Sequence, residues 1–210
     1  MHTTTKTAIL LAATIVAACA TQPRPVTDST TRLEYIGFSL LPPQGSNWYF
    51  RLENRYGAQI GKLHHDKVTG AADAKNTFYI SAFSDKVAVG IKIDTPERLL
   101  AFSEAYLRAK TAGASGRYRT LSLKLDPYHT QETDCVRFDQ EVEERNNPKF
   151  PGILQITAIG LICRNSFSAD WFIDAFYSQR YEQGAKPSTD GSFQRESEAL
   201  LKSVVFTPPE

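Results

Sequence analysis

The chain has 210 residues, of which 24 are Lys or Arg and 23 are Asp or Glu, so its formal net charge is +1. A nearly neutral surface gives no general attraction to nucleic acid, and we expect no nucleic-acid partner. A chain of this length, with 41% hydrophobic residues, suits one domain with a sizeable core.

The N-terminal residues have the pattern of an export signal. Lys6 is followed by the apolar stretch 8–18, which at eleven residues falls well short of the roughly 20 that cross a bilayer as a helix. The stretch ends in Val16-Ala17-Ala18-Cys19, which resembles the lipobox of bacterial lipoproteins. The resemblance implies removal of the signal peptide 1–18 and acylation of Cys19.

Acyl chains on Cys19 would hold the protein on a membrane. The alternative is an ordinary secretory signal that happens to contain a cysteine, and this too would export the chain. In Gram-negative lipoproteins an Asp after the cysteine retains the protein in the inner membrane, and this chain has Ala20 there. We therefore expect a protein anchored in the outer membrane, with its domain facing the periplasm.

Segment 19–33 is mostly Thr, Pro, Ser, Gln and charged residues without a hydrophobic period, which predicts a flexible tether before a single domain over 34–207. In that domain, segments rich in β-branched and aromatic residues recur between turn signals, as is typical of strands. We predict strands over 34–41, 47–53, 57–65, 76–84, 117–126, 132–143, 153–164 and 170–181.

Two helices are predicted among these strands. Thr95 is suited to cap the first helix, with Pro96 at the first helical position and the acidic Glu97 in the first turn. The second helix is expected over 192–203, and the apolar residues 204–206 after it are expected to add a short strand.

The turn at Asn146-Asn147-Pro148 sets a register for the two strands that flank it. If the midpoint of this hairpin lies near residue 149, Cys135 is directly opposite Cys163. Opposed residues in a non-hydrogen-bonded pair are near the separation that a disulfide requires, and exported chains meet an oxidising compartment. We predict a structural disulfide, with a redox pair or two free thiols as alternatives.

Strand 153–164 is largely apolar on both of its alternating sets, so it needs a covering layer on each face. Two helices far apart in sequence can provide those layers. We therefore predict an α+β fold in which a mostly antiparallel sheet is packed between helices, as an α/β/α sandwich.

The opening segment 37–40, with Pro42-Pro43 and Trp48, and the closing segment 200–206 are short motifs placed on either side of this long sheet. Together they are similar to the PsbP-like fold of photosystem II lumenal proteins. The resemblance implies a small noncatalytic binding or assembly-assisting module. A photosynthetic role does not transfer, because the lipobox and the cysteine pair depart from the photosystem proteins.

Few side chains suggest metal binding or catalysis. His64-His65-Asp66 invites a metal interpretation, but neighbours on a strand point to opposite faces, which favours a solvated strand end. His129 has no Cys or His at ligand spacing, and Ser115 does not meet the Gly-x-Ser-x-Gly pattern of a nucleophile. We predict no metal, no cofactor and no catalytic residue.

Alternation places a row of charged residues on one side of a strand: Arg137, Asp139, Glu141 and Glu143. Such a row is usually a solvated face, but a covering helix or loop would make it a polar cleft for a cation or basic ligand.

Asp174 is flanked on its face by Phe172 and Phe176, so its carboxylate needs a partner, for which we expect Arg180 or Arg137. General-acid work is the alternative role for Asp174. The candidate polar cluster therefore contains Arg137, Asp139, Glu141 and Asp174.

Aromatic residues are dense around Trp48 and Trp171. Most are expected in the core, and any that surround an exposed groove would suit glycan or peptide binding. The leading hypothesis is a noncatalytic envelope lipoprotein that binds a protein, peptide or glycan partner. A small-ligand carrier with a closed apolar cavity, and a hydrolase or transferase with an unrecognised site, are the alternatives.

Overall fold

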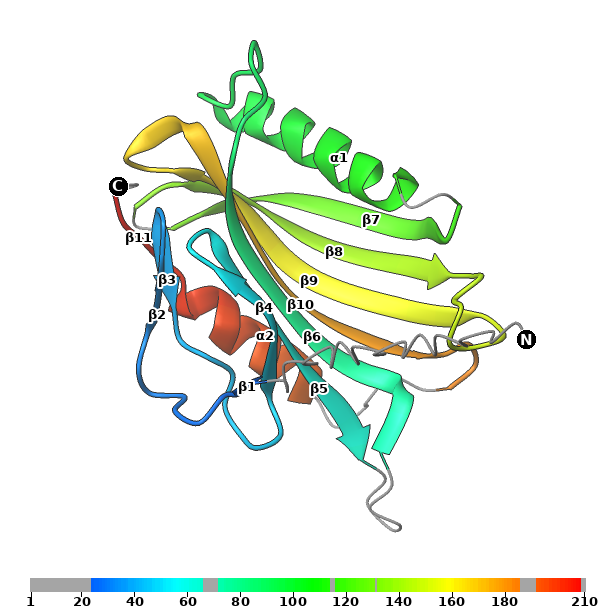
Figure 1. Cartoon of the computed structure of the whole chain (residues 1–210). Coiled ribbons are helices and arrows are strands. Elements are labelled where there is room, and N and C mark those ends of the chain that lie inside the picture. The colour runs from blue at the N-terminus through cyan, green and yellow to red at the C-terminus, as the bar shows by residue number, and fades with distance from the viewer. Residues whose placement is uncertain (1–23, 66–71, 114–115, 131, 186–191, 209–210) are drawn as a thin grey trace, which may run out of the picture.

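The computed structural model of the chain, drawn in Figure 1, describes residues 24–65, 72–113, 116–130, 132–185 and 192–208. The predicted lipobox with Cys19, and the residues Asp66 and Ser115, lie outside the described residues. Within the described part of the chain, no helix is both long and apolar enough to span a membrane.

The described residues form an eight-stranded antiparallel sheet with the order β1-β4-β5-β6-β10-β9-β8-β7 (Figure 1). A small sheet with the order β11-β3-β2 lies beside it. The strands of the large sheet are β1 (Arg24–Pro25), β4 (Tyr49–Asn54), β5 (Gly57–His65), β6 (Ala72–Lys86), β7 (Tyr118–His129), β8 (Asp134–Glu144), β9 (Leu154–Asn165) and β10 (Ser168–Glu182). Those of the small sheet are β2 (Leu33–Tyr35), β3 (Phe38–Leu40) and β11 (Val205–Phe206).

The first helix, α1 (Pro96–Ala112), begins at the predicted N-cap. The Thr95 side chain accepts a hydrogen bond from the backbone N–H of Arg98 at 3.3 Å. The buried residues Leu99 and Leu107 lie on the face of α1 that packs against β7, β8 and β9.

The second helix, α2 (Ser192–Ser203), buries Leu200 and Leu201 against β9 and β10 and also contacts β3. Arg32 connects the start of the domain to its end, because its guanidinium donates hydrogen bonds to the carbonyls of Ser39 and Ser203.

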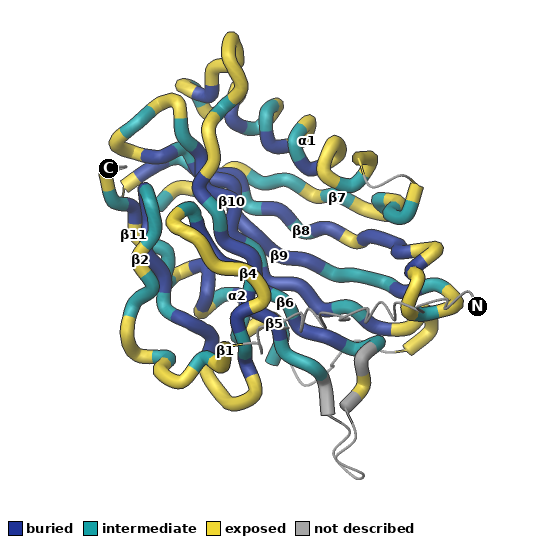
Figure 2. Tube along the Cα trace, viewed as in Figure 1, coloured by how far each residue is buried: buried dark blue, intermediate teal, exposed yellow. Residues whose placement is uncertain are grey.

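The two alternating sets of β9 face different helices, as its sequence predicts. Ile159 and Cys163 belong to the core cluster that includes α2, whereas Ala158 and Ile162 belong to the cluster that includes α1. Figure 2 shows that burial is concentrated along β8, β9 and β10 at the centre of the molecule. The two helices therefore lie on opposite faces of the sheet.

The term sandwich nevertheless fits loosely. α1 packs against β7, β8 and β9, so no described helix covers the part of that face formed by β4, β5 and β6 (Figure 1). The protein is dominated by its sheet, because two helices are too few to cover both faces of eight twisted strands.

The predicted strands from 47–53 to 170–181 are all present, with ends displaced by four residues or fewer. The predicted strand 34–41 is instead the hairpin β2–β3. Gly37 has a φ of 85°, a conformation that reverses the chain and that glycine adopts readily.

The segment expected to be a tether contains β1. Arg24 and Pro25 pair with Phe50 and Tyr49 of β4, and the N–H of Val26 donates to the carbonyl of Trp48. Residues 24–26 of the segment are therefore part of the sheet, because the edge of β4 offers unpaired backbone groups to any extended chain beside it.

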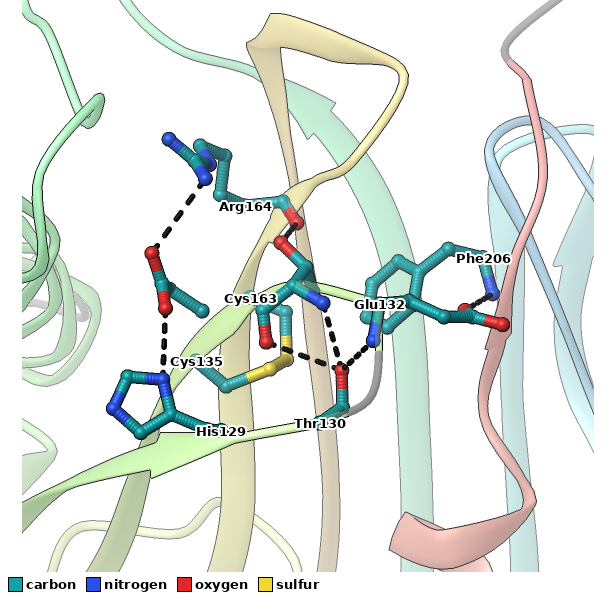
Figure 3. Close-up of a disulfide and its surroundings, with 9 residues drawn as sticks. His129, Thr130, Glu132, Cys135, Cys163, Arg164 and Phe206 are labelled. Atoms are coloured by element: carbon teal, nitrogen blue, oxygen red, sulfur yellow. Dashed lines mark hydrogen bonds and ion pairs between the residues drawn. A yellow bond between two sulfur atoms is a disulfide. The ribbon is translucent and has the colours of Figure 1, made fainter.

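The predicted disulfide is present. Cys135 of β8 and Cys163 of β9 are direct register partners, their Cα atoms are 4.0 Å apart, and their sulfurs are bonded (Figure 3). Both cysteines belong to the core cluster that contains α2. Close by, the N–H of Phe206 donates to the carboxylate of Glu132 at 3.2 Å and so connects β11 to the β7–β8 turn.

Candidate ligand-binding groove

A groove with a volume of about 1130 Å³ lies on the sheet face that carries α1. Tyr106 and Lys110 of α1 line one side, and Arg51 and Leu52 of β4 line the other. The space remains open because α1 covers the β7–β9 part of this face and not the strands beyond β10. Small-molecule pockets are usually about 300–1,000 Å³, so the groove has room for a larger, elongated ligand.

Small side chains form part of the floor of the groove. Ala158 of β9 pairs with Ser178 of β10, and Ser81 of β6 lies one row further along the same face. The lining residues on β10 extend from Trp171 to Arg180. At about 3.3 Å per residue, the groove follows this strand for roughly 30 Å.

Asp174 lies within the groove and is 3% exposed. Its Oδ2 accepts hydrogen bonds from Lys110 Nζ at 2.5 Å and from the Tyr106 hydroxyl at 3.1 Å, both on α1. Burial, together with the neighbouring Asp174 carboxylate, raises the pKa of Tyr106 well above its usual value. The second oxygen, Oδ1, has no hydrogen-bond partner among the described residues.

The prediction that Arg180 or Arg137 pairs with Asp174 is wrong. Arg180 lies six residues further along β10, a distance of about 20 Å in a strand, and Arg137 lies on the other face of the sheet. The partners come from α1 because this helix packs over the even-numbered residues of β10.

Glu144, at the end of β8, is a second buried carboxylate in the groove and is fully shielded from solvent. Its Oε1 accepts hydrogen bonds from Arg117 Nε at 2.8 Å and from Asn147 Nδ2 at 2.9 Å. Its Oε2 lies 3.6 Å from Arg180 Nη1 and accepts no hydrogen bond from the described residues. The hydrogen bond to Glu144 raises the pKa of Arg117.

Gln140 of β8 supplies a third polar group to the groove. It is 7% exposed, and its Nε2 has no hydrogen-bond partner among the described residues. Buried polar atoms are normally paired, and an unpaired one costs about 1–3 kcal/mol. The groove therefore offers one amide donor and two carboxylate acceptors, Asp174 Oδ1 and Glu144 Oε2.

Aromatic rings and cations surround this polar floor. Tyr56 and Trp171 are stacked with ring centroids 6.1 Å apart, and Lys86 Nζ lies 5.4 Å from the Trp171 ring centre. Arg51 lies 5.8 Å from the ring centre of Tyr79, and burial raises the pKa of Tyr79 to about 12. These rings present flat, partly solvated surfaces, which suit stacking on a ligand.

Sequence reasoning did not single out Glu144, Gln140 or Lys110. A signal was present for the first two, because even-numbered residues of β8 face the core under α1, where a charged or amide side chain needs a partner. Lys110 could not be placed, because its contact depends on how α1 lies across the sheet.

The predicted charged row on β8 does not form one cluster with Asp174. Asp174 is level with Val136 in the sheet register, so it lies on the opposite face from Arg137, Asp139 and Glu141. Arg137 pairs with Glu198 of α2 at 2.6 Å, Asp139 is half-buried and Glu141 is exposed.

Glu143, the last member of that row, is an ion-pair residue. It pairs with Arg119 at 3.2 Å and with Arg145. The hydrogen bond from Arg145 lowers the pKa of Glu143.

His129 is not among the residues that line the groove. His129 pairs with Asp134 at 2.8 Å at the end of β7 (Figure 3), and His64 and His65 are the last residues of β5. No group of three or more His, Cys, Asp or Glu side chains that could hold a metal ion is found in the part of the chain that the structure describes.

The chain matches no protein-family model and no curated protein sequence. Its structure is similar to LpqN, described as involved in cell envelope biogenesis of Mycobacterium tuberculosis, with 10% identity, a TM-score of 0.49, and coverage of 85% of this chain and 90% of that chain. It is also similar to the cyanobacterial PsbP protein CyanoP of Synechocystis sp. PCC 6803, with 7% identity, a TM-score of 0.45, and coverage of 84% and 92%. The expected PsbP resemblance is thus a weak structural similarity, and similarities at this level carry no functional information.

Proposed function

We infer that the protein is an exported, lipid-anchored envelope protein whose domain binds a ligand in the groove without transforming it chemically. The observation that carries this proposal is the groove itself, which is lined both by buried polar groups with atoms that make no hydrogen bond to the described residues and by partly exposed aromatic rings. A binding module needs an open, pre-formed surface of this kind.

Export is supported by the Cys135–Cys163 disulfide, because such bonds persist in oxidising compartments. It is also supported by the lipobox-like Val16-Ala17-Ala18-Cys19. With Cys19 as the anchor, β1 begins five residues later, and five residues span at most about 18 Å. The domain would therefore lie close to the membrane. Ala20 favours the outer membrane and a domain that faces the periplasm.

Binding is favoured over catalysis by the state of the two carboxylates. Asp174 and Glu144 are each held in an ion pair, with Lys110 and Arg117, and these contacts suit carboxylates that fix the shape of the groove. The described lining residues include no histidine or cysteine that could activate a nucleophile beside them.

A carrier with a closed apolar cavity is less well supported. Between α2 and the sheet, the space lined by Leu161, Ile173 and Leu201 has a volume of about 10 Å³, which holds no more than a water molecule. The larger space is the groove, which is open and has charged residues along its length.

The proposal can be tested by chemical crosslinking in cells, followed by purification of the acylated protein and mass spectrometry of what is attached to it. Three forms are compared: wild type, Trp171→Ala in the groove, and Phe167→Ala, which removes an exposed ring outside the groove. We expect an envelope component with wild type and Phe167→Ala that is lost with Trp171→Ala. Equal recovery from all three forms would contradict the proposal.

A further inference from the structure

We propose that the ligand of the groove is an extended, β-1,4-linked oligosaccharide that stacks on the rim aromatics and hydrogen-bonds to the polar floor. This inference rests on the proposed function, since it names the chemical class that the same groove takes. It follows from three features of the groove: polar atoms that make no hydrogen bond to the described residues, carboxylates whose charges are compensated by cations, and aromatic rings.

The floor requires a ligand that both donates and accepts hydrogen bonds. Asp174 Oδ1 and Glu144 Oε2 are acceptors and Gln140 Nε2 is a donor; all three side chains are more than nine-tenths buried, and all three line the groove. A sugar hydroxyl can donate to a carboxylate and accept from an amide. A chain of sugars repeats this pair of functions along its length, as the floor does.

The charge state of the floor suits hydroxyl groups. Lys110 holds one oxygen of Asp174, and Arg117 holds one oxygen of Glu144. Each carboxylate is therefore fixed in position with its charge compensated by a cation, while its other oxygen accepts no hydrogen bond from the described residues. A pre-positioned acceptor of this kind needs a neutral donor from the ligand rather than another cation.

The rings suit the apolar faces of sugars. Tyr56 and Trp171 are stacked on each other at one end of the groove, and Tyr118 lies at the end near Glu144. A pyranose in a β-linked chain presents a face of C–H groups, which complements the negative face of an aromatic ring. A β-1,4 linkage also gives an extended chain, as a groove of roughly 30 Å requires.

Two other ligand classes fit less well. An extended peptide usually adds to the edge of a sheet through its backbone, whereas the floor of this groove is a sheet face whose backbone groups are paired in the strand ladder. An acyl chain offers no hydrogen-bonding groups, so it would leave the buried polar atoms of Asp174 and Gln140 without hydrogen bonds.

The test is isothermal titration of the mature chain 19–210 carrying Cys19→Ser with three hexasaccharides: chitohexaose, cellohexaose and maltohexaose. We expect chitohexaose or cellohexaose to bind with a dissociation constant below about 1 mM, and maltohexaose, whose α-linked chain is curved, to bind at least tenfold more weakly. Trp171 should report the same event by a change in fluorescence, because Trp48 is buried in the core cluster of the other face.

Two groove variants locate the site. Gln140→Met keeps the length of the side chain and removes the donor, so affinity should fall about tenfold. Trp171→Ala removes a stacking surface and should weaken binding at least tenfold. Phe167→Ala should bind like wild type. Thermal unfolding of each variant confirms that it is folded.

Absence of binding to all three sugars, or equal binding by wild type and both groove variants, would overturn the oligosaccharide assignment. The proposed function has a separate readout. If the groove binds none of the sugars but is crosslinked to a protein or peptide in cells, the proposed binding function stands and only the oligosaccharide assignment fails. If the groove neither binds a sugar nor is crosslinked to any envelope component, both proposals are refuted.

Discussion

Reduction of the Cys135–Cys163 disulfide should destabilise the domain strongly, and the structure gives the size of the effect. The bond joins neighbouring strands across a sequence separation of 28 residues. For a loop of this length, the chain-entropy relation gives about 3.5 kcal/mol at 25 °C, because the closed loop restricts the unfolded chain. Domains are typically stable by about 5–15 kcal/mol, so this is a large share of the total.

The assay is equilibrium unfolding in urea of the mature chain 19–210 carrying Cys19→Ser, with the disulfide intact and after reduction of the denatured chain. With about 2–3 kcal/mol per molar of urea, the midpoint should fall by roughly 1–2 M on reduction. Cys135→Ala with Cys163→Ala should fall further, because both side chains are buried and their packing is also lost. Oxidised and reduced proteins with the same midpoint would refute the reasoning, as would two reactive thiols in the denatured, unreduced chain.

Three further predictions concern the anchor, the α2 contact and the packing under α1. Cys19→Ala should leave an unacylated precursor in cells; a mature, lipid-modified product from this variant would exclude Cys19 as the anchor. Glu198 of α2 accepts a hydrogen bond from Arg137, and this bond lowers the pKa of Glu198. The pair should therefore stabilise the fold above about pH 4.5, and that stability is lost as the pH falls further. Glu198→Gln should therefore cost up to about 1 kcal/mol in urea unfolding at pH 7 and much less at pH 3, and an equal cost at both pH values would contradict this. Gly160→Ala should lower the free energy of unfolding by about 1–3 kcal/mol, because the added Cβ would lie 2.3–2.6 Å from the side chains of two phenylalanines. Gly113→Ala is the control: its added Cβ would meet one backbone atom at 3.3 Å, so the stability should change little.

The register of the β8–β9 hairpin was accessible from sequence because it depends on local features. A turn rich in Asn and Pro fixes the midpoint near residue 149, and the pairing of Cys135 with Cys163 follows from counting. The first helix was accessible for the same reason, since Thr95 and Pro96 define its start. The hairpin β2–β3 was missed, because the positive φ at Gly37 turns a segment that reads as one continuous strand.

The groove could not be predicted, because it depends on where α1 lies across the sheet. Alternation correctly indicates that Asp174 needs a partner, but Lys110 reaches it from a helix 64 residues earlier in the chain. Asp174 and Arg137 lie on opposite faces of the sheet, but this follows only when the register of β8 with β9 and of β9 with β10 is known. The sequence shows which residues carry charged or polar side chains, but it does not show which of these residues share a face of the folded sheet.

The groove as binding site is tested most directly by site-specific photo-crosslinking in cells. A photoreactive amino acid is placed at Leu52, which lines the groove and is 46% exposed, or at Leu121, which lies on β7 outside the groove and is 41% exposed. The binding account predicts a discrete crosslinked adduct from position 52 and none from position 121. Equal adducts from both positions, or an adduct from position 121 alone, would contradict it.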